Sequence, residues 1–123
     1  MSLPSAPLRL LLLLAAATAA AASAGTEAQF LAANQAAMDT MMAGMQAAPR
    51  GDVDVDFAAL MIPHHQGAID MARAELRYGR NERLRRIAQE IIVEQQQEIA
   101  ALRLAVTPQA PVAALPLDPP ASP

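Results

Sequence analysis

Apolar and polar residues alternate in three successive segments of this chain with the period of an amphipathic α-helix. The period and the flanking capping residues predict helices over about 27–47, 54–78 and 82–104. Thr26 opens a capping-box pattern for the first helix, Asp52 or Asp54 can cap the second, and Asn81 can cap the third. Because short connections make successive helices antiparallel, we expect an all-α fold, a three-helix antiparallel bundle.

The two ends of the chain lack this pattern. Residues 1–24 contain a basic residue, Arg9, then an apolar run, then an A-x-A motif before Gly25, which is typical of a cleaved secretory signal peptide. An uncleaved membrane anchor is the alternative, but the apolar run is shorter than the roughly 20 residues that cross a bilayer. Residues 105–123 are rich in proline and predict a disordered tail, which leaves the helical domain at 25–104.

Composition narrows the function classes. The chain of 123 residues has room for one domain, and with no cysteine it has neither disulfides nor thiolate metal sites. Its 9 basic and 12 acidic residues give a net charge of −3 without a basic tract, which argues against nucleic-acid binding. The signal-peptide pattern predicts an exported protein, periplasmic or extracellular, with no stable membrane anchor.

Candidate metal ligands cluster in the second predicted helix. The only two histidines, His64 and His65, are adjacent, and Met61 precedes them by three and four residues. Residues at this spacing share a helix face, so Met61 can approach an ion held by either histidine. Imidazole suits zinc, copper, iron and nickel, whereas thioether sulfur favours Cu(I). Met61 also stands where the Glu-x-x-His motif of di-iron bundles has glutamate. The pattern predicts copper, with Cu(I) favoured over Cu(II) and zinc.

The first predicted helix adds a group of methionines: Met38, Met41, Met42 and Met45. Methionine often simply fills an irregular core, and this interpretation stays open beside the metal one. A turn near residue 50 places Met38 level with Pro63 and His64. Met41 and Met42 then fall level with Met61. The predicted ligands are therefore His64, His65 and Met61, assisted by Met38, Met41 or Met42.

Other residues can support or extend this site. A second turn near residue 79 places Gln95 level with His64 and Glu98 level with Met61. Pro63 removes one backbone hydrogen bond and bends the second helix, either to open space at the site or to pack around a neighbour. The additional candidates are Met45, Asp56, Met71, Gln95 and Glu98. The nearby carboxylates show no catalytic spacing, so we predict that the protein is not an enzyme.

Three segments carry a family resemblance: Asp54–Phe57, the run Met61-Ile-Pro-His-His-Gln-Gly-Ala-Ile-Asp-Met-Ala, and Ala88–Ile99. They closely resemble the bacterial family known as domain of unknown function 305, over about residues 27–104. The resemblance implies a small, exported, ferritin-like helical protein, and some members of the family are linked to copper binding and copper tolerance.

Two functions stay open at this point. The first is copper binding, in buffering or tolerance, with an unidentified protein as copper donor or acceptor. The second is a metal-free helical interaction module, in which the histidines are ordinary core or interface groups. Three helices leave an apolar flank exposed, so we also expect a homodimer that completes the bundle.

Overall fold

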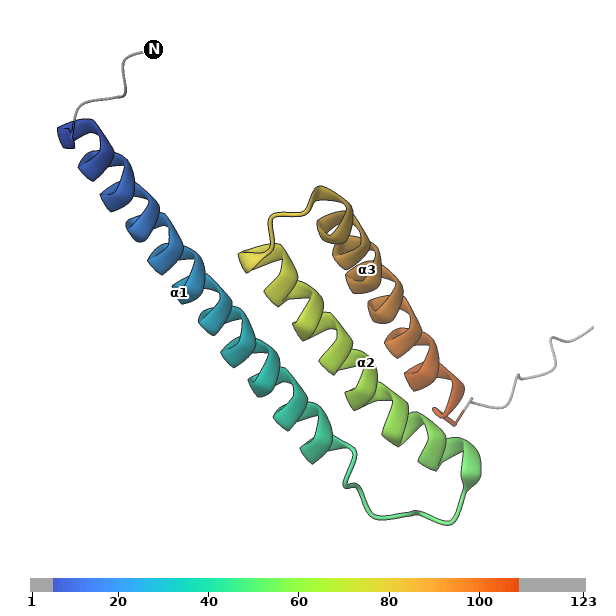
Figure 1. Cartoon of the computed structure of the whole chain (residues 1–123). Helices are drawn as coiled ribbons and strands as arrows, with labels where there is room; N and C mark the ends of the chain where they lie inside the picture. Colours follow the sequence, from blue (N-terminus) through green and yellow to red (C-terminus); the bar gives the residue numbers. More distant parts are fainter. Residues whose placement is uncertain (1–5, 109–123) are drawn as a thin grey trace, which may run out of the picture.

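A computed structural model describes residues 6–108, which form three α-helices and no strand within that range (Figure 1). The helices are α1 (Ala6–Gly44), α2 (Val53–Tyr78) and α3 (Glu82–Ala105). The predicted all-α class and the three helices are confirmed. Helices α2 and α3 begin and end within one residue of their predicted limits.

Local side-chain caps fix the beginnings of α2 and α3. Asp52, rather than Asp54, caps α2 and accepts hydrogen bonds from the N–H groups two and three residues ahead, at 2.9 and 3.1 Å. Asn81 does the same for α3, at 2.9 and 3.1 Å. These bonds satisfy N–H groups that have no partner inside the helix. The connection into α2 also contains Gly51, whose φ of 85° favours glycine.

Helix α1 differs from its prediction at both ends. It starts at Ala6 rather than at 27 and ends at Gly44 rather than at 47. The predicted capping box is wrong here, because Thr26 lies inside the helix and its hydroxyl donates to the carbonyl of Ala22 at 3.0 Å. The physical reason is that the preceding segment is rich in leucine and alanine, both strong helix formers, and nothing in it stops the helix.

The three helices lie side by side in one layer with α2 in the middle (Figure 1). Within residues 6–108, α2 packs against both neighbours, whereas no Cα atom of α1 lies within 8 Å of a Cα atom of α3. The N-terminal half of α1 extends beyond the other two helices. Most of the side chains in the core are alanines. The buried apolar side chains in the described residues are Ala37, Ala58, Ile69, Ala72, Ala74, Ala88 and Ile99. Small side chains allow the helix backbones to approach closely.

The predicted end segments fall partly outside this description. Residues 1–5 and 109–123 are not described, so most of the predicted tail lies outside the described range. Cleavage after Ala24 also remains a prediction. In the part of the chain that is described, no helix has the length and apolarity needed to cross a membrane.

Candidate metal site

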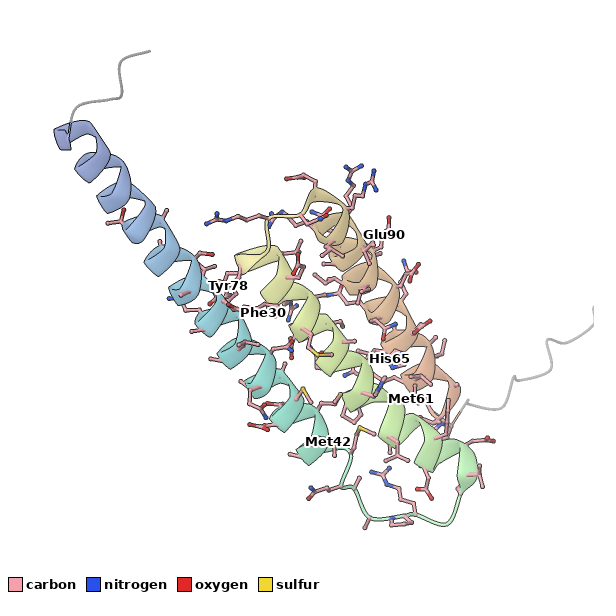
Figure 2. All side chains as sticks on the ribbon, viewed as in Figure 1. Phe30, Met42, Met61, His65, Tyr78 and Glu90 are labelled. Atoms are coloured by element: carbon pink, nitrogen blue, oxygen red, sulfur yellow. The ribbon has the colours of Figure 1, made fainter. Side chains whose placement is uncertain are left out.

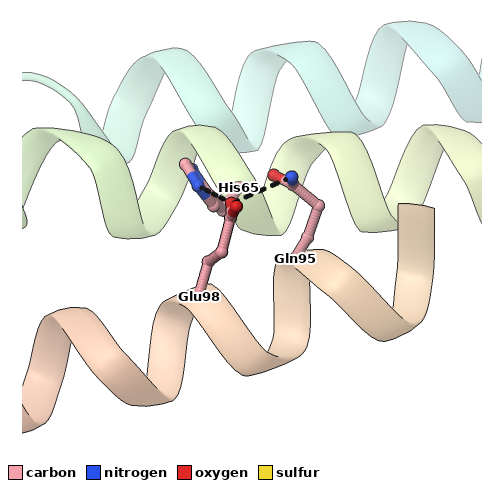
Figure 3. Close-up of polar contacts among 3 residues, drawn as sticks. All are labelled: His65, Gln95 and Glu98. Atoms are coloured by element: carbon pink, nitrogen blue, oxygen red, sulfur yellow. Dashed lines mark hydrogen bonds and ion pairs between the residues drawn. The ribbon is translucent and has the colours of Figure 1, made fainter. Parts of the chain in front are cut away.

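His65 is the buried polar residue at the contact between α2 and α3. It is 8% exposed, and its Nε2 lies 2.6 Å from Oε2 of Glu98 on α3 (Figure 3). The amide nitrogen of Gln95, one turn earlier on α3, donates to the same oxygen at 3.1 Å. This arrangement orients the His65 ring through a carboxylate that is itself held by an amide.

The second ring nitrogen of His65 has a different environment. Nδ1 is buried and has no hydrogen-bond partner in the described structure. An ionised carboxylate can only accept, so Nε2 carries the hydrogen that is given to Glu98. In the neutral ring Nδ1 then keeps a lone pair. A buried acceptor without a partner is unusual in proteins, and a metal ion is one group that satisfies it.

A groove between α2 and α3 joins His65 to Met61. Its volume is about 410 Å³, and its walls are mostly apolar: Phe57, Met61, His65, Glu98, Ala101, Leu102 and Ala105. Figure 2 shows Met61 and His65 on the same part of α2. The pair has the i, i+4 spacing that the sequence predicted would share a face. The structure therefore brings together a thioether, an imidazole and a carboxylate.

His64 lies on a different side of α2 from His65. Adjacent helical residues diverge by about 100°, and here His64 is exposed whereas His65 is buried. The two ring centroids are 5.9 Å apart, with an edge-to-face orientation. The two histidines are therefore neighbours that face different surroundings.

The register between α1 and α2 differs from the predicted one. Gly44, the last residue of α1, packs so closely on Pro63 that a Cβ there would lie 2.6 Å from the proline Cβ. A Cβ at Gly67 would lie 2.8 Å from the Cβ and the Sδ of Met41. Met41 is thus level with Gly67, and Met38 falls beyond it, away from His64. The prediction that Met38 lies level with Pro63 and His64 is therefore wrong.

The long connection explains this shift. Residues 45–52 are not helical, and α2 begins ten residues before its contact with Gly44, so the chain does not fold back symmetrically about residue 50. Pro63 packs against its neighbour on α1, which favours the packing interpretation of the proline. The α2–α3 register was predicted more closely, since Glu98 meets His65 one turn from its predicted partner Met61.

The remaining candidates are spread over the layer. Met38 and Met42 are 41% and 53% exposed on α1, and Met45 is half-buried near its end. Asp56 accepts a hydrogen bond from the backbone N–H of Arg50 at 2.8 Å, so it stabilises the connection. Met71 lines a second apolar groove farther along the layer. In residues 6–108 no three side chains of the His, Cys, Asp and Glu types form a metal-binding group.

One family model matches residues 10–106 of the chain, and its description is "Domain of unknown function (DUF305)". The chain belongs to the DUF305 family. No curated protein and no solved structure matches it. Membership confirms the predicted family, and the matched range starts at residue 10, upstream of the predicted start near residue 27.

The sequence of this DUF305 chain did not reveal the direct partner of the buried histidine. Glu98 was only an additional candidate, yet its carboxylate contacts His65. The groove walls contributed by Phe57 and Leu102 were also missed. The available signal was the placement of Gln95, Glu98 and Leu102 at three-to-four-residue intervals along the inward side of α3.

Proposed function

We propose that this DUF305 protein is exported and binds copper, preferentially Cu(I), through His65 and Met61, in copper buffering or tolerance. The observation that carries the proposal is His65 itself: a buried imidazole with one nitrogen on the Glu98 carboxylate and the other without a partner. Metal-binding histidines characteristically donate their other nitrogen to a carboxylate or carbonyl, which fixes the ring and raises its basicity.

The roles of the residues follow from their contacts. His65 supplies nitrogen, and Met61, in the same groove, supplies the soft sulfur that favours Cu(I). Glu98 holds the imidazole, and Gln95 holds Glu98. His64 and the exposed Met38 and Met42 are additional ligands in this proposal. Met41 is packed against Gly67, which favours a packing role for it.

Copper titration of matched variants tests the proposal. The full chain is expressed, intact mass establishes whether it begins at Gly25, and Cu(I) is titrated against a competing chelator. We expect Glu98→Gln to lower the affinity about 10–100-fold, as loss of a ligand-orienting group does. His65→Ala and Met61→Leu should lower it at least as much. Binding through histidine should also weaken in acid, because the ring must lose its proton to bind metal.

Matched controls separate the site from general packing. Met71→Leu changes a half-buried methionine of the same helix in the other groove, and should bind Cu(I) as wild type does. Glu94→Gln is the matched control for Glu98→Gln, because it makes the same change at a carboxylate of α3 one turn from Glu98. If His65→Ala and Met61→Leu bind Cu(I) with wild-type affinity, the copper proposal is refuted.

A metal-free interaction module is the second candidate function. It is supported by the exposure of large apolar side chains on all three helices, among them Leu31 at 56%, Phe57 at 56% and Ile87 at 50%. In this alternative the His65–Glu98 pair is a structural contact between α2 and α3. This alternative is favoured if wild type binds Cu(I) and zinc no more tightly than a variant that lacks both His64 and His65.

A further inference from the structure

Helix α2 presents three stripes of residues, and the chain covers only two of them. Pro63 and Gly67 lie against α1, and His65 lies against α3. The third stripe follows alternating steps of four and three residues: Phe57, Met61, His64, Ala68, Met71 and Glu75. This is the spacing of a seam that packs against another helix. In the described residues α2 packs against α1 and α3 alone, so no further helix covers this stripe.

The same side of the layer is apolar on the neighbouring helices. A second groove, of about 310 Å³, opens along this stripe between α1 and α3 and contains Phe30, Met71, Ile87 and Ile91. Leu84 and Ile87 on α3 are 52% and 50% exposed. We name this side of the layer the open face. It includes the walls of both grooves, because Phe57 and Met61 of the first groove share the α2 stripe with Ala68 and Met71 of the second.

The side of α2 away from the open face is polar. Gln66, Asp70, Arg73 and Arg77 recur there at helical spacing. The Asp70 carboxylate accepts from Gln66 at 3.2 Å and from Arg73 at 3.0 Å. One side of the layer is therefore polar, whereas the open face is apolar. Stable domains close a core between at least two packed layers, and the described chain supplies one.

We propose that two copies of this chain pack together through their open faces, and that the copper site is completed between the two copies. The dimensions fit. With about 1.5 Å of rise per residue, α3 is about 36 Å long. Three helices spaced about 8–10 Å apart are about 28 Å wide, so the face covers on the order of 1,000 Å². A stable interface needs about 800 Å² per partner.

The distribution of ligands also favours a second copy. His64 lies in the middle of the open stripe and is exposed, although its neighbours on the stripe are apolar. On α1, Met38 is exposed and lies one turn after Asn34, which lines the second groove. Within the described residues, one chain brings His65 and Met61 into a common groove with Glu98, but not His64 or Met38. In a two-fold dimer the same patch faces itself, so each copy offers its own His64, Met61 and Met38 to the other.

Charge placement on α3 provides the test. Ile87→Glu puts a carboxylate on the open face, whereas Val93→Glu puts one at an equally exposed position, 54%, on the outer side of α3. Sedimentation equilibrium of the metal-free protein should show a dimer for wild type and for Val93→Glu. Ile87→Glu should weaken the dimer about 100-fold, because it buries a charge in place of an apolar side chain. Leu84→Glu repeats the test if Ile87→Glu loses its helical circular-dichroism signal.

Copper affinity separates the two parts of the inference. The shared site rests on the proposed function. Ile87→Glu keeps every candidate ligand, yet it should lose tight Cu(I) binding together with the dimer, while Val93→Glu keeps both. A monomeric wild type, or an unchanged Ile87→Glu dimer, overturns the docking surface. A monomeric Ile87→Glu with wild-type copper affinity overturns the shared site. A wild-type dimer that binds no copper supports the docking surface and refutes the proposed function.

Discussion

Gly67 marks a close approach of α1 to α2 in the histidine region. A methyl group at this position would lie 2.8 Å from both the Cβ and the Sδ of Met41, and 3.0 Å from its Cγ. Carbon atoms in contact prefer separations of about 3.5–4.0 Å. The sulfur can move by rotation, but Cβ is attached directly to the backbone of α1. Gly67→Ala therefore requires the two helices to separate by about 1 Å at this point.

Two opposing contributions set the size of the effect. Alanine is favoured over glycine inside a helix by about 1 kcal/mol. Overpacking a close contact costs about 1–3 kcal/mol, and the fixed position of the Met41 Cβ favours the upper part of that range. We expect the free energy of unfolding to fall by about 1–2 kcal/mol in total. For a domain of this size, each kcal/mol lowers Tm by about 4–8 °C.

Urea denaturation followed by far-ultraviolet circular dichroism measures this change. Gln66→Ala is the matched control, because Gln66 precedes Gly67 on α2 but is exposed. Its effect should stay within about 0.5 kcal/mol. If Gly67→Ala is instead more stable than wild type by about 1 kcal/mol, the full helix-propensity gain, then α1 does not pack on Gly67 and the reasoning fails.

Two further stability predictions concern the core and a cap. Ile69 is 1% exposed and is the largest fully buried side chain among the described residues, so Ile69→Ala should cost about 2–5 kcal/mol in urea denaturation; a loss below about 1 kcal/mol would contradict its core position. Asp52→Ala removes the two N-cap hydrogen bonds of α2 and should cost about 1 kcal/mol, whereas Asp52→Asn keeps an acceptor and most of the stability. Equal losses for the two Asp52 variants would rule out capping.

Helices α2 and α3 were predictable from the sequence because the forces that set their ends are local. Asp52 and Asn81 bond to N–H groups only two and three residues away. Helix α1 was predictable only in its second half. Gly25 alone does not end a helix, since glycine costs only about 1 kcal/mol there, so the helix continues back through the leucine- and alanine-rich segment to Ala6.

The sequence by itself determined which residue types can bind metal and that Met61 lies one turn from the histidines. Only the tertiary structure decided that His65 faces α3 and that His64 faces outward, because adjacent helical residues diverge by about 100° and periodicity does not say where the neighbouring helices lie. It also decided the register of α1. Gly44 contacts Pro63 and Met41 contacts Gly67, which differs from the register that a symmetric turn near residue 50 predicts. Helix register depends on how the side chains of two helices interlock, and that information is shared between segments distant in sequence.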